Sequence, residues 1–387
     1  MKWIARAQFG AVVRLAAAIL AAALALSASA AVAAEFQTKA KQAILVDFDT
    51  GAVLYETAAD DLMPPASMSK IMTVYMVFEK LSAGQLALED AMPISEKAWR
   101  MGGSKMFVEV GKTARVEDLL RGIIVQSGND ACIVVAEGLA GSEEAFAEQM
   151  TERARELGLV HSTFTNSTGW PDPNHLATAR ELAQLATLLI RNFPEYYHYF
   201  AEKTFTYNKI KQGNRNPLLY KNMGADGLKT GHTEGSGYGL TVSVVRGERR
   251  LILVLNGLES VRERGQEAEK LIAWGFREFE NYALFEAGET VDQAAVWLGD
   301  SAVAPLTLEE DLIVTLPRKS RSGMKVSVVY DGPIPAPIEE GQRIATLRIE
   351  APDTEPVERP LYATEAVERL GFFGRIGSAL GYLVWGP

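Results

Sequence analysis

The amino-acid sequence predicts an α/β domain followed by a small all-β domain. β-Rich runs occur at residues 43–56 and again at 238–258, and several buried helices are predicted between them. Strands at both ends of a helical region favour a layered domain whose N- and C-terminal parts share one sheet. From about Ala283 the sequence changes to short alternating runs broken by Gly, Pro and Asp, which predict an all-β unit. The 387 residues are enough for two such domains.

The first 34 residues have the pattern of a secretory signal peptide. A basic start leads into the apolar run LAAAILAAALALSASA, and small residues end at an A-x-A-like site near Ala33 or Ala34. The alternative is a membrane-spanning anchor, but the alanine-rich core and the cleavage-like end favour removal. We therefore expect residues 1–34 to be a signal peptide and the mature protein to be exported.

The charge of the chain argues against a nucleic-acid partner. The net charge is −10, and the first 34 residues contribute three basic residues and no acidic one, which leaves about −13 on the remainder. The single cysteine, Cys132, cannot form an internal disulfide. No histidine nearby is available to activate it, so we expect a small buried side chain rather than a catalytic thiol.

The predicted elements follow in chain order. Two β-rich runs flank Asp49–Gly51 and predict a hairpin, and the largely apolar run after Ser67 predicts a helix buried on most sides. A second hairpin is predicted around the RGER turn of the run at 238–258. Four further segments have the apolar pattern of helices: residues 116–126, 131–140, 178–192 and 267–282.

These elements divide the chain into four parts. We expect an α/β domain over residues 35–282 and a small β-rich domain over 283–364, after the signal peptide. Residues 365–387 form the last part, whose segment GFFGRIGSALGYLVWGP predicts an amphipathic helix with one small-residue face. This segment is too short and too glycine-rich for a comfortable membrane span, and its aromatic residues suit a membrane interface. The alternative is a helix docked on the β domain.

Ser67 and Lys70, at the start of the first predicted helix, are the strongest candidates for chemistry. A serine hydroxyl is a poor nucleophile until a base takes its proton, and a neutral lysine can be that base. Residues three apart on a helix lie on one face, and burial shifts a lysine pKa toward the neutral form. The same spacing recurs at Ser322 and Lys325, in a polar basic segment with no buried helix behind it. The spacing alone is therefore weak evidence.

Two more motifs support the first pair. Ser127, Gly128 and Asn129 lie between two predicted helices, and Lys229, Thr230 and Gly231 come just before the second hairpin. Separately, the first could be a turn or helix cap and the second an exposed strand end. In the order S-x-x-K, S-x-N and K-T-G, they match the motif set of penicillin-binding proteins and class A β-lactamases. The middle motif here has glycine in place of aspartate.

With these motifs and flanks such as PPASMSK, RGIIVQSGNDAC and DGLKTGHT, the chain resembles the D-alanyl-D-alanine carboxypeptidases, the low-molecular-mass penicillin-binding proteins. The resemblance covers nearly the whole chain. It implies a β-lactamase/transpeptidase-like domain, a sheet flanked by helices, followed by the β-rich domain and the amphipathic tail. It also implies removal of the terminal D-alanine from peptidoglycan pentapeptides through an acyl-enzyme. β-Lactam antibiotics would be covalent inhibitors, and no metal or other cofactor is implied.

The resemblance also implies roles for individual residues. Ser67 would be the nucleophile, Lys70 its base, and Ser127 the relay for the leaving-group proton. The implied substrate-binding residues are Asn129 at the substrate amide, Lys229 facing it from the strand, Thr230 and Arg264 at the substrate carboxylate, and His232 through its backbone N–H in the oxyanion hole with that of Ser67. Arg262 lies two residues from Arg264 and is the alternative for that position.

The family also implies a location and leaves two competing functions. The exported protein would be periplasmic and attached peripherally to the inner membrane by its C-terminal helix. A class A-like β-lactamase would share the acylation step, but the corresponding region offers Glu181 without the E-x-x-L-N pattern of those enzymes. A non-enzymatic β-lactam sensor would be expected to carry a spanning helix and a signalling domain.

Overall fold

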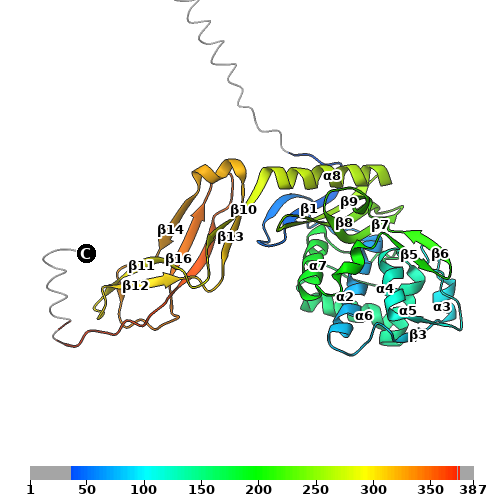
Figure 1. Cartoon of the computed structure of the whole chain (residues 1–387), viewed down its shortest axis with the longest axis horizontal. Coiled ribbons are helices and arrows are strands. Elements are labelled where there is room, and N and C mark those ends of the chain that lie inside the picture. Colours follow the sequence, from blue (N-terminus) through cyan, green and yellow to red (C-terminus); the bar gives the residue numbers. More distant parts are fainter. Residues whose placement is uncertain (1–35, 373, 375–387) are drawn as a thin grey trace, which may run out of the picture. The chain divides into compact units, whose positions relative to one another are not determined.

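The computed structural model describes residues 36–372 and residue 374 (Figure 1). The predicted signal peptide and nearly all of the predicted tail helix lie outside the described residues. The predictions made for those segments therefore stay predictions.

Within the described residues, the α/β domain contains a five-stranded antiparallel sheet. Its strand order is β2 (Val53–Thr57), β1 (Gln42–Asp47), β9 (Arg249–Leu258), β8 (Gly237–Arg246) and β7 (Ala225–Thr233). Strand β1, from the start of the domain, pairs with β9, which lies about 200 residues later in the chain. The prediction that both ends of the domain share one sheet is confirmed, and so are both predicted hairpins.

Helices cover both faces of this sheet (Figure 1). Helix α8 (Val261–Glu278) packs against β8 and β9 on one side. Helix α7 (Ala179–Asn192) packs against β1 and β9 on the other side, where α2 (Lys70–Ser82) lies behind it. The elements around them are η1 (Ala66–Ser69), β3 (Ala91–Pro93), α3 (Glu96–Arg100), β4 (Thr113–Arg115), α4 (Val116–Ile124), α5 (Asn129–Ala140), α6 (Glu143–Glu156), η2 (Tyr197–Ala201), β5 (Thr204–Tyr207), β6 (Ile210–Gly213) and η3 (Pro217–Tyr220).

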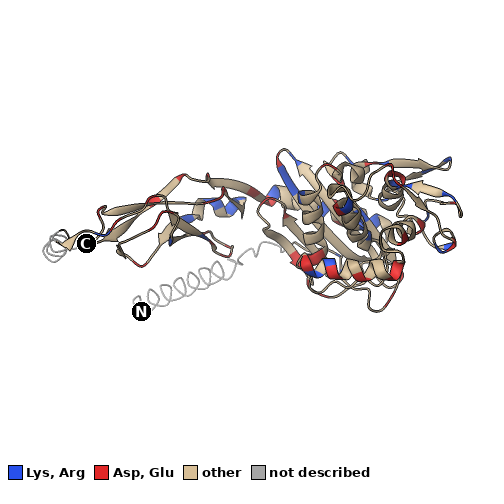
Figure 2. Ribbon diagram, turned by 90° about the horizontal axis from the view of Figure 1, so that it is seen from below, with Lys and Arg blue, Asp and Glu red and all other residues tan. Residues whose placement is uncertain are grey.

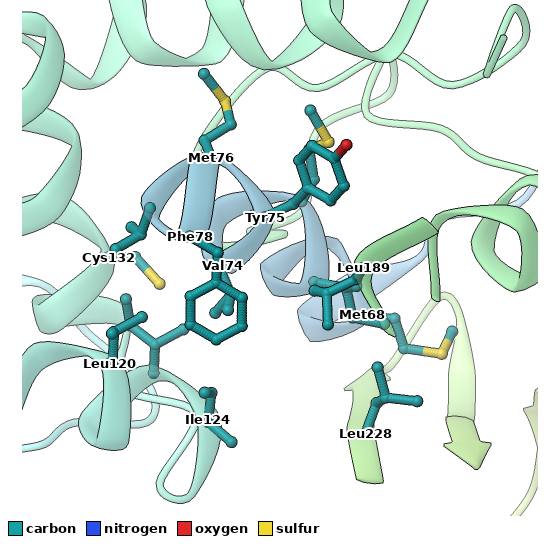
Figure 3. Close-up of a cluster of buried hydrophobic side chains, with 14 of the residues drawn as sticks. Met68, Val74, Tyr75, Met76, Phe78, Leu120, Ile124, Cys132, Leu189 and Leu228 are labelled. Carbon is teal, nitrogen blue, oxygen red and sulfur yellow. The ribbon is translucent and has the colours of Figure 1, made fainter. Parts of the chain in front are cut away.

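Helix α2 is the centre of the hydrophobic core. Every residue from Lys70 to Phe78 is buried, as the apolar sequence predicted. Figure 3 shows Val74, Tyr75 and Phe78 of this helix within a cluster of side chains from α4, α5, α7 and β7. Cys132 of α5 is part of the cluster and is fully buried, and burial raises the pKa of its thiol to about 12. The expectation of a small buried side chain is confirmed.

One predicted helix has the wrong limits. The sequence predicted a helix over residues 267–282, but α8 begins at Val261, where the Ser260 side chain accepts a hydrogen bond from the backbone N–H of Glu263. The helix ends at Glu278, and the next residues form strand β10 (Phe279–Phe285). The backbone groups of β10 pair with β13 (Leu312–Pro317), which a helix would not allow. The expected domain division after residue 282 therefore falls inside a strand.

The C-terminal part of the described chain is all-β, as predicted. Its six-stranded sheet has the order β14 (Lys325–Val329), β16 (Arg343–Glu350), β17 (Val357–Ala363), β12 (Val303–Thr307), β11 (Thr290–Trp297) and β15 (Ile334–Pro335). The 3-10 helix η4 (Arg318–Gly323) joins β13 to β14. Leu306, Leu347 and Leu361 are fully buried in the hydrophobic core of this β domain, which is separate from the cluster around α2.

The distribution of charged residues and the length and hydropathy of the helices are relevant to nucleic-acid and membrane partners. Basic and acidic residues are interspersed along the described chain rather than gathered into one basic stripe (Figure 2). Among the described helices, none is both long enough and apolar enough to cross a membrane.

Candidate active site

Ser67 lies at the edge of an open cleft with a volume of about 960 Å³. It belongs to the 3-10 turn η1, which leads directly into α2, and its side chain is half-buried. The preceding residue, Ala66, has φ of 49°, a left-handed conformation that is unusual for a residue with a Cβ. Other residues of the cleft wall are Pro64, Gly103, Ser104, Asn129, Thr168, Gly169, Trp170, His175 and His232.

Lys70 lies behind Ser67 and is fully buried. Its Nζ is 2.9 Å from Ser67 Oγ, 2.8 Å from Asn129 Oδ1 and 2.5 Å from the carbonyl oxygen of Thr168. Desolvation by burial lowers the pKa of Lys70 from 10.5 to about 8. A neutral amine has two N–H donors and one lone pair. The two oxygens that can only accept take the donors, which leaves the lone pair for the Ser67 hydroxyl proton.

Asn129, the first residue of α5, contacts Lys70, and Ser127 lies two residues before it in the chain. Asn129 accepts from Lys70 through Oδ1 and donates one amide N–H to the Gly102 carbonyl at 2.9 Å, so its second N–H is left for another acceptor. Ser127 has φ of 60°, and its buried Oγ has no hydrogen-bond partner among the described residues. A backbone at positive φ and a buried hydroxyl without a partner are both typical of functional positions.

The K-T-G motif lies inside strand β7, not at an exposed end before the hairpin. A Cβ on Gly231 would come within 2.8 Å of the Pro65 carbonyl oxygen, so glycine allows β7 to approach η1 closely. Lys229, two residues earlier, lies on the same face of the strand. Burial and the neighbouring Lys70 lower the pKa of Lys229 well below its ordinary value. Thr230 is also buried, at 6% exposure.

Arg264, rather than Arg262, is the buried arginine of α8. Its guanidinium carbon lies 5.8 Å from the centre of the Tyr238 ring, and that ring stacks on His232 at 3.9 Å. Burial lowers the pKa of Arg264 to about 10, and its Nε has no hydrogen-bond partner among the described residues. The Arg262 side chain is exposed, so the two arginines differ in burial, and the choice between them for the substrate carboxylate stays a prediction.

The loop before α7 was not predicted as part of the site, and it contributes to the site through its backbone. Asn166 Oδ1 accepts hydrogen bonds from the N–H groups of Thr168, Gly169 and Trp170, and so fixes the Thr168 carbonyl that contacts Lys70. Gly169, at φ of 76°, packs so closely that a Cβ would lie 1.8 Å from the Ala66 carbonyl oxygen. A backbone carbonyl has no sequence signature. The only indication of this loop in the sequence is the run N-S-T-G, whose residue types are typical of turns.

Asp130 was also missed, although it follows the S-G-N motif directly. Its buried carboxylate accepts from the backbone N–H groups of Met106, Phe107 and Val108 at 2.8 to 3.2 Å. It thereby holds the chain that follows Gly103 in the cleft wall. An aspartate just before a predicted helix has an ordinary explanation from helix polarity, which concealed this role.

Glu181, in the first turn of α7, binds the loop that precedes this helix. Its carboxylate accepts from the His161 backbone N–H at 2.8 Å and from the Ser162 hydroxyl at 2.5 Å, and its side chain is buried. Within the described chain, the cleft wall does not include it. The structure therefore gives Glu181 a role in shaping the loop, and it does not place a glutamate next to Ser67 from this position.

The chain is similar to known proteins over most of its length. The family model for D-alanyl-D-alanine carboxypeptidase matches residues 27–259, and that for the C-terminal domain of penicillin-binding protein 5 matches residues 279–369. D-alanyl-D-alanine carboxypeptidase DacC of Escherichia coli is 41% identical over 341 residues, covering 86% of this chain and 85% of the relative.

Solved structures show the same similarity. Penicillin-binding protein 5 from Haemophilus influenzae has a TM-score of 0.80 at 35% identity, covering 87% of this chain and 99% of that structure. Penicillin-binding protein D2 from Listeria monocytogenes, in its ampicillin-bound form, has a TM-score of 0.58 at 29% identity, covering 62% of this chain and 99% of that structure. The chain belongs to the D-alanyl-D-alanine carboxypeptidase family, the serine peptidases of the penicillin-binding protein 5 type.

Proposed function

We propose that this protein removes the C-terminal D-alanine from peptidoglycan pentapeptides, with Ser67 as its nucleophile. The observation that carries the proposal is the contact of 2.9 Å between Ser67 Oγ and the Nζ of the fully buried Lys70. The family provides the reaction class, and this pair provides an activated hydroxyl at the edge of an open cleft.

The proposed reaction has two steps. Neutral Lys70 takes the Ser67 proton as Oγ attacks the carbonyl carbon of the penultimate D-alanine, and the backbone N–H groups of Ser67 and His232 stabilise the oxyanion. The C–N bond then breaks, and Ser127 relays a proton to the leaving amine of D-alanine. A water molecule attacks the ester, releases the shortened peptide and restores the Ser67 hydroxyl.

The remaining residues are proposed to bind the substrate. The free amide N–H of Asn129 donates to a carbonyl of the peptide. Lys229, Thr230 and Arg264 bind the terminal carboxylate, and the charge of Arg264 favours an anion there. β-Lactams would occupy the same cleft and acylate Ser67, as the ampicillin-bound relative suggests.

We also propose that the protein works in the periplasm, where its substrate is found. The signal-like residues 1–34 support export, and the aromatic, glycine-rich end of the chain supports peripheral attachment to the outer face of the inner membrane. The interspersed charges of the described residues support a partner other than nucleic acid.

A β-lactamase is the competing function, and the use of Glu181 argues against it. A β-lactamase must hydrolyse the penicilloyl ester rapidly, and class A enzymes use a glutamate near the nucleophile. Here the carboxylate of Glu181 is bound by His161 and Ser162. A non-enzymatic sensor is not favoured either, because the family consists of carboxypeptidases.

Mass spectrometry after penicillin treatment tests the proposal. The intact mass should rise by one penicillin molecule, the modified peptide should contain Ser67, and D-alanine should be released from pentapeptide before treatment only. Ser67→Ala should abolish both the adduct and the release. Ser322→Ala is the matched control, since it removes the serine of the second S-x-x-K pair, and it should change neither.

The lifetime of the adduct separates the two enzyme classes. After excess penicillin is removed, the adduct should last much longer than the time that the unmodified enzyme needs to hydrolyse one peptide. Penicillin turnover as fast as peptide hydrolysis would favour the β-lactamase, and an adduct that survives Ser67→Ala would refute the nucleophile.

A further inference from the structure

The unusual backbone at Ala66 is connected to a buried histidine. The Ala66 carbonyl accepts a hydrogen bond from Ser69 Oγ at 2.9 Å, and Ser69 Oγ lies 2.7 Å from His175 Nε2. Ser69 is fully buried and His175 is 2% exposed. The contact joins two segments 106 residues apart, so it ties the turn that carries Ser67 to the loop before α7.

The hydrogen bonds that link His175, Ser69 and Ala66 all donate in the same direction, toward the Ala66 carbonyl. His175 Nδ1 accepts from the Thr165 backbone N–H at 3.2 Å, so in neutral imidazole the proton is on Nε2. Burial lowers the pKa of His175 to about 4, which keeps the ring neutral at physiological pH. Nε2–H therefore donates to Ser69 Oγ, and the Ser69 hydroxyl donates to the Ala66 carbonyl.

The Ala66 carbonyl has to be held because its backbone is strained. At φ of 49°, Ala66 is in the left-handed region, which costs a non-glycine residue free energy unless neighbouring contacts impose it. Gly169 also packs closely on this carbonyl. The Ala66 carbonyl belongs to the same peptide group as the Ser67 N–H, so fixing one fixes the other.

We infer that His175, acting through Ser69, is a positioning residue for acylation: it orients the Ala66–Ser67 peptide group and thus both the nucleophile and its oxyanion-binding N–H. The inference rests on the proposed function of Ser67. His175 does not exchange protons with the substrate. Its contribution is to hold a geometry, and a displacement of about 1 Å at a reacting group can lower a rate by about a hundredfold.

Paired substitutions test this inference through the rate of acylation by a fluorescent penicillin and through kcat and KM for an acylated D-Ala-D-Ala peptide. His175→Gln places an amide N–H where Nε2 was and should retain the Ser69 contact. His175→Asn places its amide near Nδ1 and should lose it. His175→Asn and Ser69→Ala should each lower kcat and the acylation rate at least about tenfold with little change in KM. His175→Gln should retain most of the wild-type kcat and acylation rate.

The double variant Ser69→Ala/His175→Asn provides a second criterion. Because both changes interrupt one chain of hydrogen bonds, the double variant should acylate no more slowly than the slower single variant. His198→Asn is the matched control, since His198 is an exposed histidine whose Nδ1 contacts the Glu195 carbonyl, and it should acylate at the wild-type rate.

Several results would overturn the inference. If Ser69→Ala acylates at the wild-type rate, the inference is wrong, and this test does not depend on whether the histidine variants fold. Equal losses in His175→Gln and His175→Asn, or a lowered melting temperature with unchanged acylation, would reduce His175 to a packing role. If the wild-type protein itself is not acylated, the proposed function fails instead, so the two failures are distinguishable.

Discussion

At the scale of single residues, the chemistry of the site depends on where Lys70 gives its protons. Two acceptors that cannot donate, Asn129 Oδ1 and the Thr168 carbonyl, surround an amine whose pKa burial has lowered to about 8. The neutral form has its lone pair toward Ser67, whereas the charged form would donate to Ser67 and could not accept its proton.

This arrangement predicts the pH dependence of acylation. Below pH 8 the neutral fraction of Lys70 falls roughly tenfold per pH unit, so the penicillin acylation rate should rise with pH and level off above about 8. Stopped-flow measurement of acylation between pH 5 and pH 9.5 checks the profile. Lys70→Arg should be inactive throughout, because arginine stays protonated. Lys229→Ala should keep the rising part at a lower rate, and its loss there would assign the titration to Lys229.

The residues that could be predicted from the sequence are those whose side chains form motifs. Ser67 and Lys70 share a helical face, and S-G-N and K-T-G distinguish them from Ser322 and Lys325. The Thr168 carbonyl could not be predicted, because it is a backbone group 98 residues from Lys70. His175 could not be predicted either, since a lone histidine does not reveal a partner 106 residues away.

At the scale of elements, long apolar patterns predicted the structure well and polar ones did not. The helix α2 and the β8–β9 hairpin were predicted because their buried residues are nearly continuous. Helix α6 was missed, since only Phe146, Ala147, Met150 and Ala154 of its 14 residues are buried. The end of α8 was misplaced because Phe279 and Tyr282 fit a helical apolar face until their pairing with β13 is known.

The loop before α7 gives a test at this scale, with two glycines as a matched pair. Gly169 and Gly111 both have φ of 76°, but a Cβ on Gly169 would lie 1.8 Å from the Ala66 carbonyl oxygen, whereas Gly111 has no atom of the described structure within 4 Å of that position. Gly111→Ala should cost about 1–2 kcal/mol of stability from backbone strain and leave acylation unchanged. Gly169→Ala adds a backbone clash and should cost at least about 3 kcal/mol and slow acylation.

Chemical denaturation and penicillin acylation of both variants check this pair. If Gly169→Ala is no less stable than Gly111→Ala and acylates at the wild-type rate, the close contact between the loop and the Ser67 turn does not matter for the site.

At the scale of the whole molecule, the two domains have separate hydrophobic cores. The α/β domain contains every proposed catalytic residue, and the β domain has a core of its own around Leu306, Leu347 and Leu361. Their order was predictable from the change of pattern near Ala283. The exact point of division stays a prediction, since strand β10 follows α8 without a loop whose composition would mark a boundary.

The end of the β domain shows where the tail can be removed. Arg369 bridges to Gly299, and the Leu370 N–H donates to the Leu298 carbonyl at 2.9 Å, so the chain is hydrogen-bonded to the domain up to residue 370. A chain that ends at residue 370 keeps these contacts. We therefore expect deletion of residues 371–387 to leave a folded enzyme with unchanged peptide hydrolysis.

The same deletion should release the enzyme from membranes into the soluble periplasmic fraction. Arg375 is the only charged residue of the segment, so apolar burial rather than attraction to anionic lipid should dominate the attachment of the full chain. Sedimentation of the full chain with lipid vesicles should accordingly change little between low salt and 1 M salt, which screens charges beyond about 3 Å. Arg375→Gln should sediment like the wild-type protein, and Trp385→Ser should sediment less. If the truncated chain still sediments with membranes, the attachment lies elsewhere; if it unfolds, residues 371–387 instead pack on the β domain.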